Sequence, residues 1–179
     1  MQVTQTKLAG VLILEPRVFG DERGHFLETY NRKKYSQIPG LDLEFVQDNH
    51  SRSRKNVLRG LHLQRRNPQG KLVRVATGHV WDVAVDVDPR SPTFREWVGI
   101  DLTDENNLQF YIPPGYAHGF CVLSDLADFE YKCTTFYDPD DEAGLLWNDP
   151  DLDIRWPVTQ PVLSRRDAAN ASLRTFLED

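Results

Sequence analysis

The feature that most constrains this fold is an alternation of apolar and polar side chains, repeated in short segments along the chain. It is clearest at 79–87, where Trp81, Val83 and Val85 share one face opposite Asp82. Similar segments fall at 11–15, 25–30, 43–47, 71–76, 95–102, 108–112, 118–123 and 128–136. Turn sequences such as NPQG, DPRSP and PPGY separate them. Many short strands joined by turns predict an all-β sandwich or barrel.

Helical patterns are scarce in this sequence. The stretch 31–38 could form one short helix, and 165–177, rich in alanine and leucine, is a better candidate. No internal repeat or low-complexity linker divides the chain. Its 179 residues suit one well-buried domain, so we expect residues 1–179 to form a single domain.

The composition excludes several classes of protein. Acidic residues number 27 against 21 basic ones, a net charge of −6, which argues against a general nucleic-acid binder. The apolar run at 11–14 is far too short for a membrane span, and the first ten residues lack the order of a signal peptide. Cys121 and Cys133 have no metal-type spacing. We therefore expect a cytoplasmic protein with no membrane or nucleic-acid partner.

Charge is distributed unevenly. Residues 50–74 contain many Lys and Arg but no Asp or Glu, whereas residues 138–153 contain many Asp and no Lys or Arg. The basic segment is either a solvated face or a phosphate site, since Arg and Lys both bind phosphate oxygens. Charge alone favours the solvated face. The acidic segment is typical of a turn-rich surface loop.

The stretch PPGYAHGF at 113–120 looks like the second conserved motif of cupin barrels, whose histidine often binds a metal. The partner motif would need two histidines one residue apart and a nearby glutamate. Here GLHLQRR supplies His62, but Gln64 takes the place of the second histidine and arginines follow it. His62 and His118 alone make a poor cage for a divalent ion. We therefore expect a barrel without a metal.

Three further residues each have a structural and a chemical interpretation. His62 should face the same side as Gln64, either as a structural histidine or as a general base. Tyr131 is either a core tyrosine or a general acid. Asp167 has the spacing of a helix cap with Ser164, yet a carboxylate there could also orient His62. The residues themselves favour the structural interpretation for His62 and Asp167, whereas periodicity does not separate the two interpretations of Tyr131.

Taken together, seven segments resemble the dTDP-sugar epimerase family of the cupin superfamily, specifically its dTDP-4-dehydrorhamnose 3,5-epimerases. In chain order they are VFGDERGHFLETYN, FVQDNHS, VLRGLHLQ, GKLVRVATGHVWDVAVDVDPRSPTF, YIPPGYAHGF, EYKCTTFYDPDDEAGLLWNDPDLDIRWP and LSRRD. The resemblance covers nearly the whole chain. It implies a jelly-roll β-barrel with a few short helices, a homodimer, and no metal or organic cofactor. The implied substrate is dTDP-4-dehydro-6-deoxy-D-glucose, converted to dTDP-4-dehydro-β-L-rhamnose for dTDP-L-rhamnose biosynthesis.

The resemblance also implies roles for individual residues. His62 would be the base, Asp167 its partner in a dyad, Tyr131 the acid on the opposite face, and Lys71 the cation that steadies the enolate oxygen. Substrate binding would involve Arg23, Glu28, Gln47, Asp48, Asn49, Arg59, His118, Glu142 and Arg166, with Phe19 and Tyr137 as further candidates. Because related dimers exchange N-terminal strands, some nucleotide contacts would come from the partner subunit.

Two other functions compete with this interpretation. An epimerase acting at only C3 or only C5 of another deoxysugar would share most of these motifs, and no motif distinguishes it. A catalytically silent cupin could bind a sugar nucleotide without turning it over. Retention of His62, Lys71, Tyr131 and Asp167 together argues against the silent cupin, since a pure binder needs no acid and base.

Overall fold

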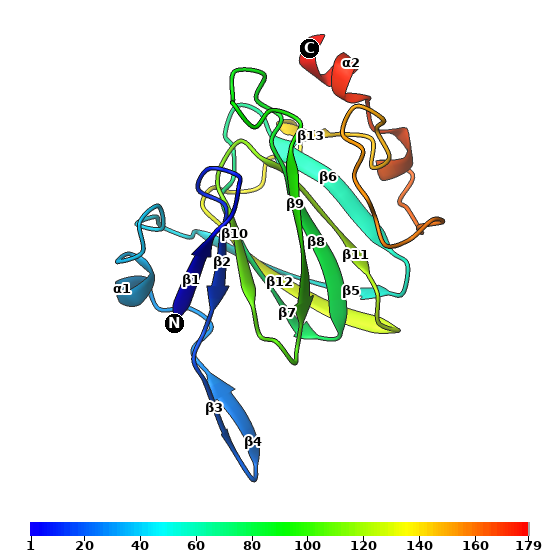
Figure 1. Cartoon of the computed structure of the whole chain (residues 1–179). Helices are drawn as coiled ribbons and strands as arrows, with labels where there is room; N and C mark the ends of the chain where they lie inside the picture. The colour runs from blue at the N-terminus through cyan, green and yellow to red at the C-terminus, as the bar shows by residue number, and fades with distance from the viewer. Residues whose placement is uncertain (179) are drawn as a thin grey trace.

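The computed structural model describes residues 1–178 and consists mainly of two antiparallel sheets that face each other (Figure 1). The six-stranded sheet has the order β1 (Gln2–Gln5), β2 (Leu12–Glu15), β10 (Gln109–Ile112), β7 (Lys71–Thr77), β12 (Leu126–Cys133) and β5 (Gln47–Arg54). The five-stranded sheet has the order β13 (Glu142–Gly144), β6 (Leu58–Gln64), β11 (Ala117–Val122), β8 (His79–Val85) and β9 (Trp97–Thr103). The predicted all-β fold is confirmed.

The main core lies between the two sheets. Phe110 and Phe129 of the six-stranded sheet are fully buried with Leu102 and Phe120 of the other sheet. The rings of Phe120 and Phe129 stack with their centroids 4.1 Å apart. Burying an aromatic side chain of this size stabilises a fold by about 1.5–3 kcal/mol. In β8 both faces are buried: Val80 and Ala84 face the other sheet, whereas Val83 and Val85 of the predicted apolar face pack on the outer side with Leu173 and Phe176.

One of the expected strand positions was wrong, and another was too long. The segment 43–47 is not a strand, and β5 begins only at Gln47. Alternation of apolar and polar residues does not detect the strand at 47–54, because its inward side chains are polar and most of its outward ones are charged. The expected strand at 25–30 is confined to β4 (Gly24–Leu27).

The helices are shorter than expected. In 31–38 only α1 (Arg32–Tyr35) forms, a single turn capped by the side chain of Asn31. The expected helix at 165–177 is divided into a 3₁₀ turn, η1 (Asp167–Ala169), and α2 (Leu173–Glu178). Asn170 separates them because its backbone is extended. Within residues 1–178 there is no helix long and apolar enough to cross a membrane.

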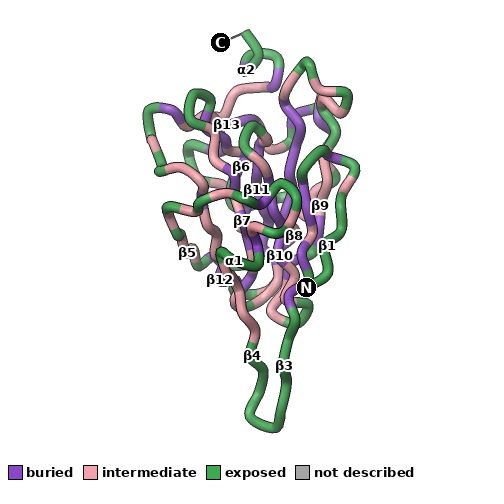
Figure 2. The backbone as a smooth tube through the Cα atoms, turned by 90° about the vertical axis from the view of Figure 1, so that its left-hand side faces the viewer, coloured by how far each residue is buried: buried purple, intermediate pink, exposed green. Residues whose placement is uncertain are grey.

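The strands β3 (Val18–Asp21) and β4 form a hairpin that projects away from both sheets (Figure 2). Its side chains are exposed, including Phe26 at 70% and Phe19 at 48%. A two-stranded ribbon with no sheet or helix against it is marginally stable in water. Large apolar side chains on such a ribbon indicate an interaction surface.

The C-terminal segment packs on the outer face of the five-stranded sheet. Leu173 and Phe176 of α2 are buried with Leu61, Leu63 and other apolar residues of that face. The side chain of Asp149 accepts a hydrogen bond from the backbone N–H of Leu173 at 2.8 Å, which fixes the start of α2. This packing brings the preceding turn η1 against β6.

Candidate active site

A cavity of about 450 Å³ opens among strands of both sheets, two loops and the C-terminal segment around η1. Most of the residues that line it have polar or charged side chains. The residues that line it are Gln47, Asn49, Ser51, Arg59, His62, Gln69, Lys71, His118, Gly119, Phe120, Tyr131, Tyr137, Glu142, Ser164, Arg166 and Asp167. The four residues to which the resemblance gives catalytic roles are all in this set.

His62 lies on β6 and is held by the C-terminal turn. Its Nε2 is 2.6 Å from Oδ1 of Asp167, whose other oxygen accepts a hydrogen bond from Ser164 at 2.8 Å. Asp167 is only 4% exposed, and burial opposes its ionisation, but the bonds from His62 and Ser164 hold the pKa of the carboxyl below its ordinary value. Because Nε2 faces a carboxylate it carries the proton, which leaves Nδ1 as the acceptor.

The position of His62 beside His118 depends on two glycines. The two histidines are partners in the pairing of β6 with β11. A Cβ added to Gly60, whose φ is 120°, would lie 2.7 Å from the Cα of Gly119. A Cβ added to Gly119 would lie 2.8 Å from the carbonyl oxygen of Arg59. Only glycine at both positions allows the two backbones to approach this closely.

Lys71 and His118 place two nitrogen groups on the cavity wall beside a buried carboxyl, Asp82. The Nε2 of His118 lies 3.0 and 2.9 Å from the two oxygens of Asp82, and Asp82 has no exposed surface. Burial lowers the pKa of His118 and raises that of Asp82, while the bond between them opposes both shifts. Burial also lowers the pKa of Lys71. A developing oxyanion in the cavity would meet the ammonium of Lys71 here, while His118 is bonded to Asp82.

Tyr131 enters the cavity from β12, on the sheet opposite to His62. Burial raises the pKa of its hydroxyl above the ordinary value. The phenol therefore carries its proton at neutral pH, as a general acid must.

The rim of the cavity is a hydrogen-bonded set built around Glu142. The hydroxyl of Tyr137 donates to Oε2 of Glu142 at 2.6 Å, and Arg166 pairs with the same oxygen. The other oxygen, Oε1, lies 3.8 Å from Nδ1 of His62. The backbone N–H of Tyr137 donates to Gln47 at 2.9 Å. The rim thus joins the loop after β12 to β5, β13 and the C-terminal turn.

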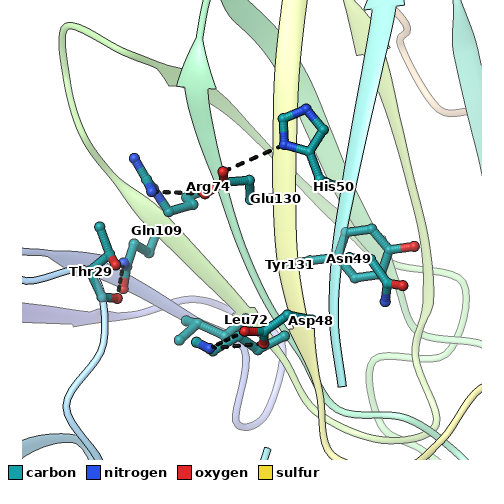
Figure 3. A pocket seen from close by; sticks show the side chains of 10 residues that line it. Thr29, Asp48, Asn49, His50, Leu72, Arg74, Gln109, Glu130 and Tyr131 are labelled. Atoms are coloured by element: carbon teal, nitrogen blue, oxygen red, sulfur yellow. Dashed lines mark hydrogen bonds and ion pairs between the residues drawn. The ribbon is translucent and has the colours of Figure 1, made fainter. Parts of the chain in front are cut away.

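Four of the expected binding residues do not reach this cavity. Phe19 and Arg23 are on the projecting hairpin, and Glu28, just beyond it, pairs with Lys34. Asp48 points to the outer face of the six-stranded sheet because side chains alternate along β5. There it pairs with Lys132 and lines a second cavity of about 300 Å³ (Figure 3).

Three residues that the structure places at the site carry no functional signal in the sequence. Asp82 was assigned only to the polar face of its strand, yet it is the buried partner of His118. Ser164 was noted only for its capping spacing, yet it also bonds the side chain of Asp167. Ser51 lines the cavity, and its hydroxyl is the single buried side-chain polar atom without a partner among residues 1–178. Ser51 follows Gln47 and Asn49 at intervals of two residues, so the three side chains share one face of β5, and this pattern could have identified it.

Within the described part of the chain, no group of three or more His, Cys, Asp and Glu side chains could hold a metal ion. His62 and His118 are adjacent across β6 and β11, but each is bonded to its own carboxylate. The geometry is that of two separate histidine–carboxylate pairs. It suits proton transfer and anion stabilisation.

Comparison with known proteins decides the family. The family model described as dTDP-4-dehydrorhamnose 3,5-epimerase matches residues 5–175. The chain belongs to this family. It is 56% identical over 171 residues to the dTDP-4-dehydrorhamnose 3,5-epimerase of Salmonella typhimurium, covering 94% of this chain and 93% of that one. The expected family and its isomerase chemistry are therefore confirmed.

Solved structures of the family agree with the fold described above. A dTDP-6-deoxy-D-glucose-3,5-epimerase from Legionella pneumophila, crystallised with dTDP-4-keto-L-rhamnose, has a TM-score of 0.94 at 50% identity, covering 97% of this chain and 93% of that one. A 3'-monoepimerase from Streptomyces bikiniensis, in complex with dTDP-quinovose, has a TM-score of 0.90 at 32% identity, covering 97% and 88%. The family fold thus accommodates epimerisation at one carbon as well as at two.

Proposed function

We propose that this epimerase-family chain inverts C3 and C5 of dTDP-4-dehydro-6-deoxy-D-glucose to give dTDP-4-dehydro-β-L-rhamnose, for dTDP-L-rhamnose biosynthesis. The observation that carries the proposal is the His62–Asp167 pair in a cavity that Lys71 and Tyr131 also line. Relatives at 50% identity or more that carry the 3,5-epimerase name support it.

The first half of the reaction is removal of a proton from the carbon next to the C4 ketone. Nδ1 of His62 accepts that proton, and Asp167 stabilises the imidazolium that forms. The C–H bonding electrons move into the ring, and the negative charge collects on the C4 oxygen. The ammonium of Lys71 donates a hydrogen bond to that enolate oxygen, and His118 lines the same wall of the cavity. One such donor contributes roughly 3–4 kcal/mol in comparable oxyanion sites.

The second half returns a proton to the same carbon from the opposite face. The hydroxyl of Tyr131 supplies it, the C4 carbonyl re-forms, and exchange with solvent restores the phenol and the neutral imidazole. The same cycle at the second carbon completes the reaction. Substrate and product are isomers, so the proposed cycle transfers only protons and calls for no redox cofactor or metal.

We further propose that the protein acts as a homodimer in which the hairpin of each subunit completes the partner's site. The hairpin projects from its own subunit and exposes Phe19 and Phe26. Phe19, Arg23 and Glu28 are also the expected binding residues that lie outside their own cavity, together with Asp48. If the hairpin contacts the partner subunit, Phe19, Arg23 and Glu28 would reach the nucleotide bound in the partner's cavity. Replacing Phe19 and Phe26 by Ser should give monomers in sedimentation analysis and raise KM.

Residues 1–179 are proposed to work as one domain, in the cytoplasm. Both cysteines, Cys121 and Cys133, are free and buried, which agrees with a reducing compartment.

The decisive experiment is incubation with dTDP-4-dehydro-6-deoxy-D-glucose in D₂O, with NMR at C3 and C5 and a ketoreductase to trap the product. Deuterium at both carbons with the L-rhamno configuration supports the proposal. Deuterium at one carbon would establish the second candidate, a single-site epimerase, which the resemblance to the 3'-monoepimerase favours. No deuterium above the enzyme-free control would leave only sugar-nucleotide binding.

A further inference from the structure

Gln64 lies on β6 two residues after His62, yet it does not line the cavity. It is 3% exposed, and its side-chain amide is fully engaged elsewhere. Nε2 donates to the carbonyl oxygens of Asn67 at 2.8 Å and Phe136 at 3.4 Å, and Oε1 accepts from the backbone N–H of Asp138 at 2.9 Å. One side chain therefore holds two backbone positions of residues 134–141, which we name the rim loop.

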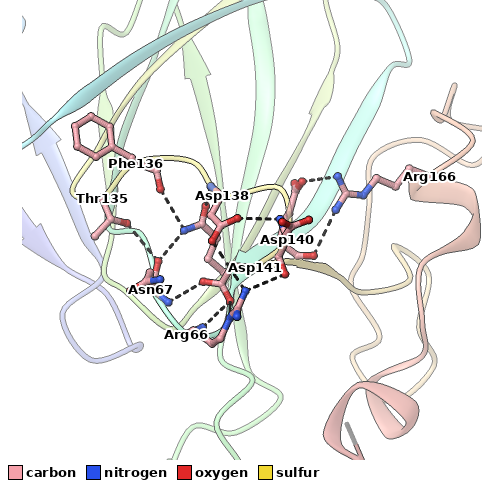
Figure 4. A network of polar contacts seen from close by, with 10 residues as sticks. Arg66, Asn67, Thr135, Phe136, Asp138, Asp140, Asp141 and Arg166 are labelled. Atoms are coloured by element: carbon pink, nitrogen blue, oxygen red, sulfur yellow. Dashed lines mark hydrogen bonds and ion pairs between the residues drawn. The ribbon is translucent and has the colours of Figure 1, made fainter.

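Asp141, the last residue of the rim loop, ties the loop to the turn that follows β6. It is 4% exposed, and its carboxylate accepts the backbone N–H of Arg66 at 2.8 Å and that of Asn67 at 2.7 Å. The guanidinium of Arg66 adds a third bond at 3.1 Å. Hydrogen bonds to an ionised acceptor are stronger than neutral ones. Figure 4 shows Phe136, Asp138 and Asp141 gathered around Arg66 and Asn67.

The rim loop carries one cavity residue and leads directly into another. Tyr137 is in the loop, and Glu142 follows it at the start of β13. Tyr137, at 48% exposed, and the guanidinium of Arg166 stand together at the open side of the cavity. A half-exposed aromatic ring beside a guanidinium suits a base and a phosphate group.

The groups assigned to proton transfer are held by other contacts. His62 is fixed by Asp167, and Lys71 and Tyr131 are fixed by the pairing of β7 with β12. Neither Gln64 nor Asp141 bonds any of these side chains. Loss of either residue should therefore loosen the rim and leave the proton-transfer groups in place.

We propose that Gln64 and Asp141 are positioning residues that hold the rim loop ready for the nucleotide part of the substrate, so that they govern its affinity and not the rate of proton transfer. The inference rests on the proposed function for the identity of the substrate. Its physical basis is pre-organisation, since a loop that is already ordered loses less entropy when a ligand binds. Gln64 thus occupies the position of a metal-binding histidine in other cupins, and here its side chain holds the rim loop.

The test compares Asp141→Asn and Gln64→Glu with wild type. Asp141→Asn removes the charge from the acceptor of three bonds. Gln64→Glu keeps the shape but turns an oxygen toward two carbonyl oxygens. Asp86→Asn is the matched control, because Asp86 is also 4% exposed, accepts bonds from Asp88 and Thr93 in a turn, and does not line the cavity.

The readouts are the Kd of dTDP by titration calorimetry, kcat and KM with the sugar nucleotide, and Tm. We expect both rim variants to raise Kd and KM about tenfold with kcat within about twofold of wild type. Asp86→Asn should lower Tm without changing Kd or KM. If Gln64→Glu does not fold, Asp141→Asn provides the same comparison.

An unchanged Kd, a fall in kcat at constant KM, or an equal rise in KM for Asp86→Asn would overturn the inference. Wild-type protein that does not bind dTDP would overturn it too. Because binding of dTDP requires no turnover, the outcomes read from Kd are independent of the deuterium experiment that tests the proposed function.

Discussion

Replacing Asp167 by asparagine isolates the charge of the dyad from its geometry. The amide of D167N can present its oxygen to Nε2 of His62 and its NH₂ group to the hydroxyl of Ser164, so both contacts of the carboxylate have a neutral counterpart. What disappears is the negative charge that stabilises the imidazolium.

The size of the effect follows from the contact itself. With charge centres about 4 Å apart and an effective dielectric of about 20, the attraction is roughly 4 kcal/mol. A neutral hydrogen bond retains about 1 kcal/mol of this. The imidazolium forms only during the reaction, so the loss of about 3 kcal/mol falls on the transition state. We expect kcat to fall about 10²-fold with little change in KM.

The assay is steady-state epimerisation together with thermal unfolding. Since the contacts of Asp167 with its neighbours are conserved, Tm should stay within about 3 °C of wild type. Asp149→Asn is the matched control: Asp149 is a buried carboxylate of the same C-terminal segment that accepts backbone N–H bonds and does not line the cavity. Unchanged kcat in D167N, with a large loss of Tm, would show that Asp167 is only a cap for η1.

Three further predictions follow from the site and the sheets. Tyr131→Phe should lose at least 10²-fold in epimerisation but still exchange substrate protons with D₂O, because His62 remains; full product formation would remove Tyr131 from the acid role. Lys71→Met should lower kcat about 10²- to 10³-fold at nearly constant KM, and steady-state kinetics showing a rise in KM alone would contradict a role on the enolate. The hydrogen bond from Arg52 lowers the pKa of Asp128 to about 2 from 3.8. A pKa that is lower in the folded state contributes stability above about pH 4, and this stability disappears as the pH falls toward 2. Tm of Asp128→Asn should therefore fall less steeply than that of wild type between about pH 4 and about pH 2. An equally steep fall of Tm in both proteins would refute the assignment.

The sequence predicted best where a strand has one apolar face. The alternation at 79–87 corresponds to β8, and those at 71–76, 108–112 and 128–136 to β7, β10 and β12. It failed at β5, whose residues form a wall of the polar cavity on one side and a largely charged surface on the other. Both faces of β5 are polar, so no alternation of apolar side chains marks this strand in the sequence.

The catalytic site was predictable only in part. Resemblance located His62, Lys71, Tyr131 and Asp167, and the structure brings them to one cavity. Asp82 carried no such signal, since a polar residue in an alternating strand is expected to face solvent. It is buried because it shares a face of β8 with Val80 and Ala84, which pack between the two sheets, and His118 offers a partner on β11.

The contact between Gly60 and Gly119 has a consequence for how this enzyme could change during evolution. Backbone contact sets the separation of the two histidines, with no intervening side chain. Core substitutions elsewhere in the barrel can therefore alter stability while the spacing of His62 and His118 stays the same. New substrate preferences are accordingly easier to acquire through the rim and the hairpin, where side chains determine the shape, than through the barrel floor, where any added carbon would push the strands apart.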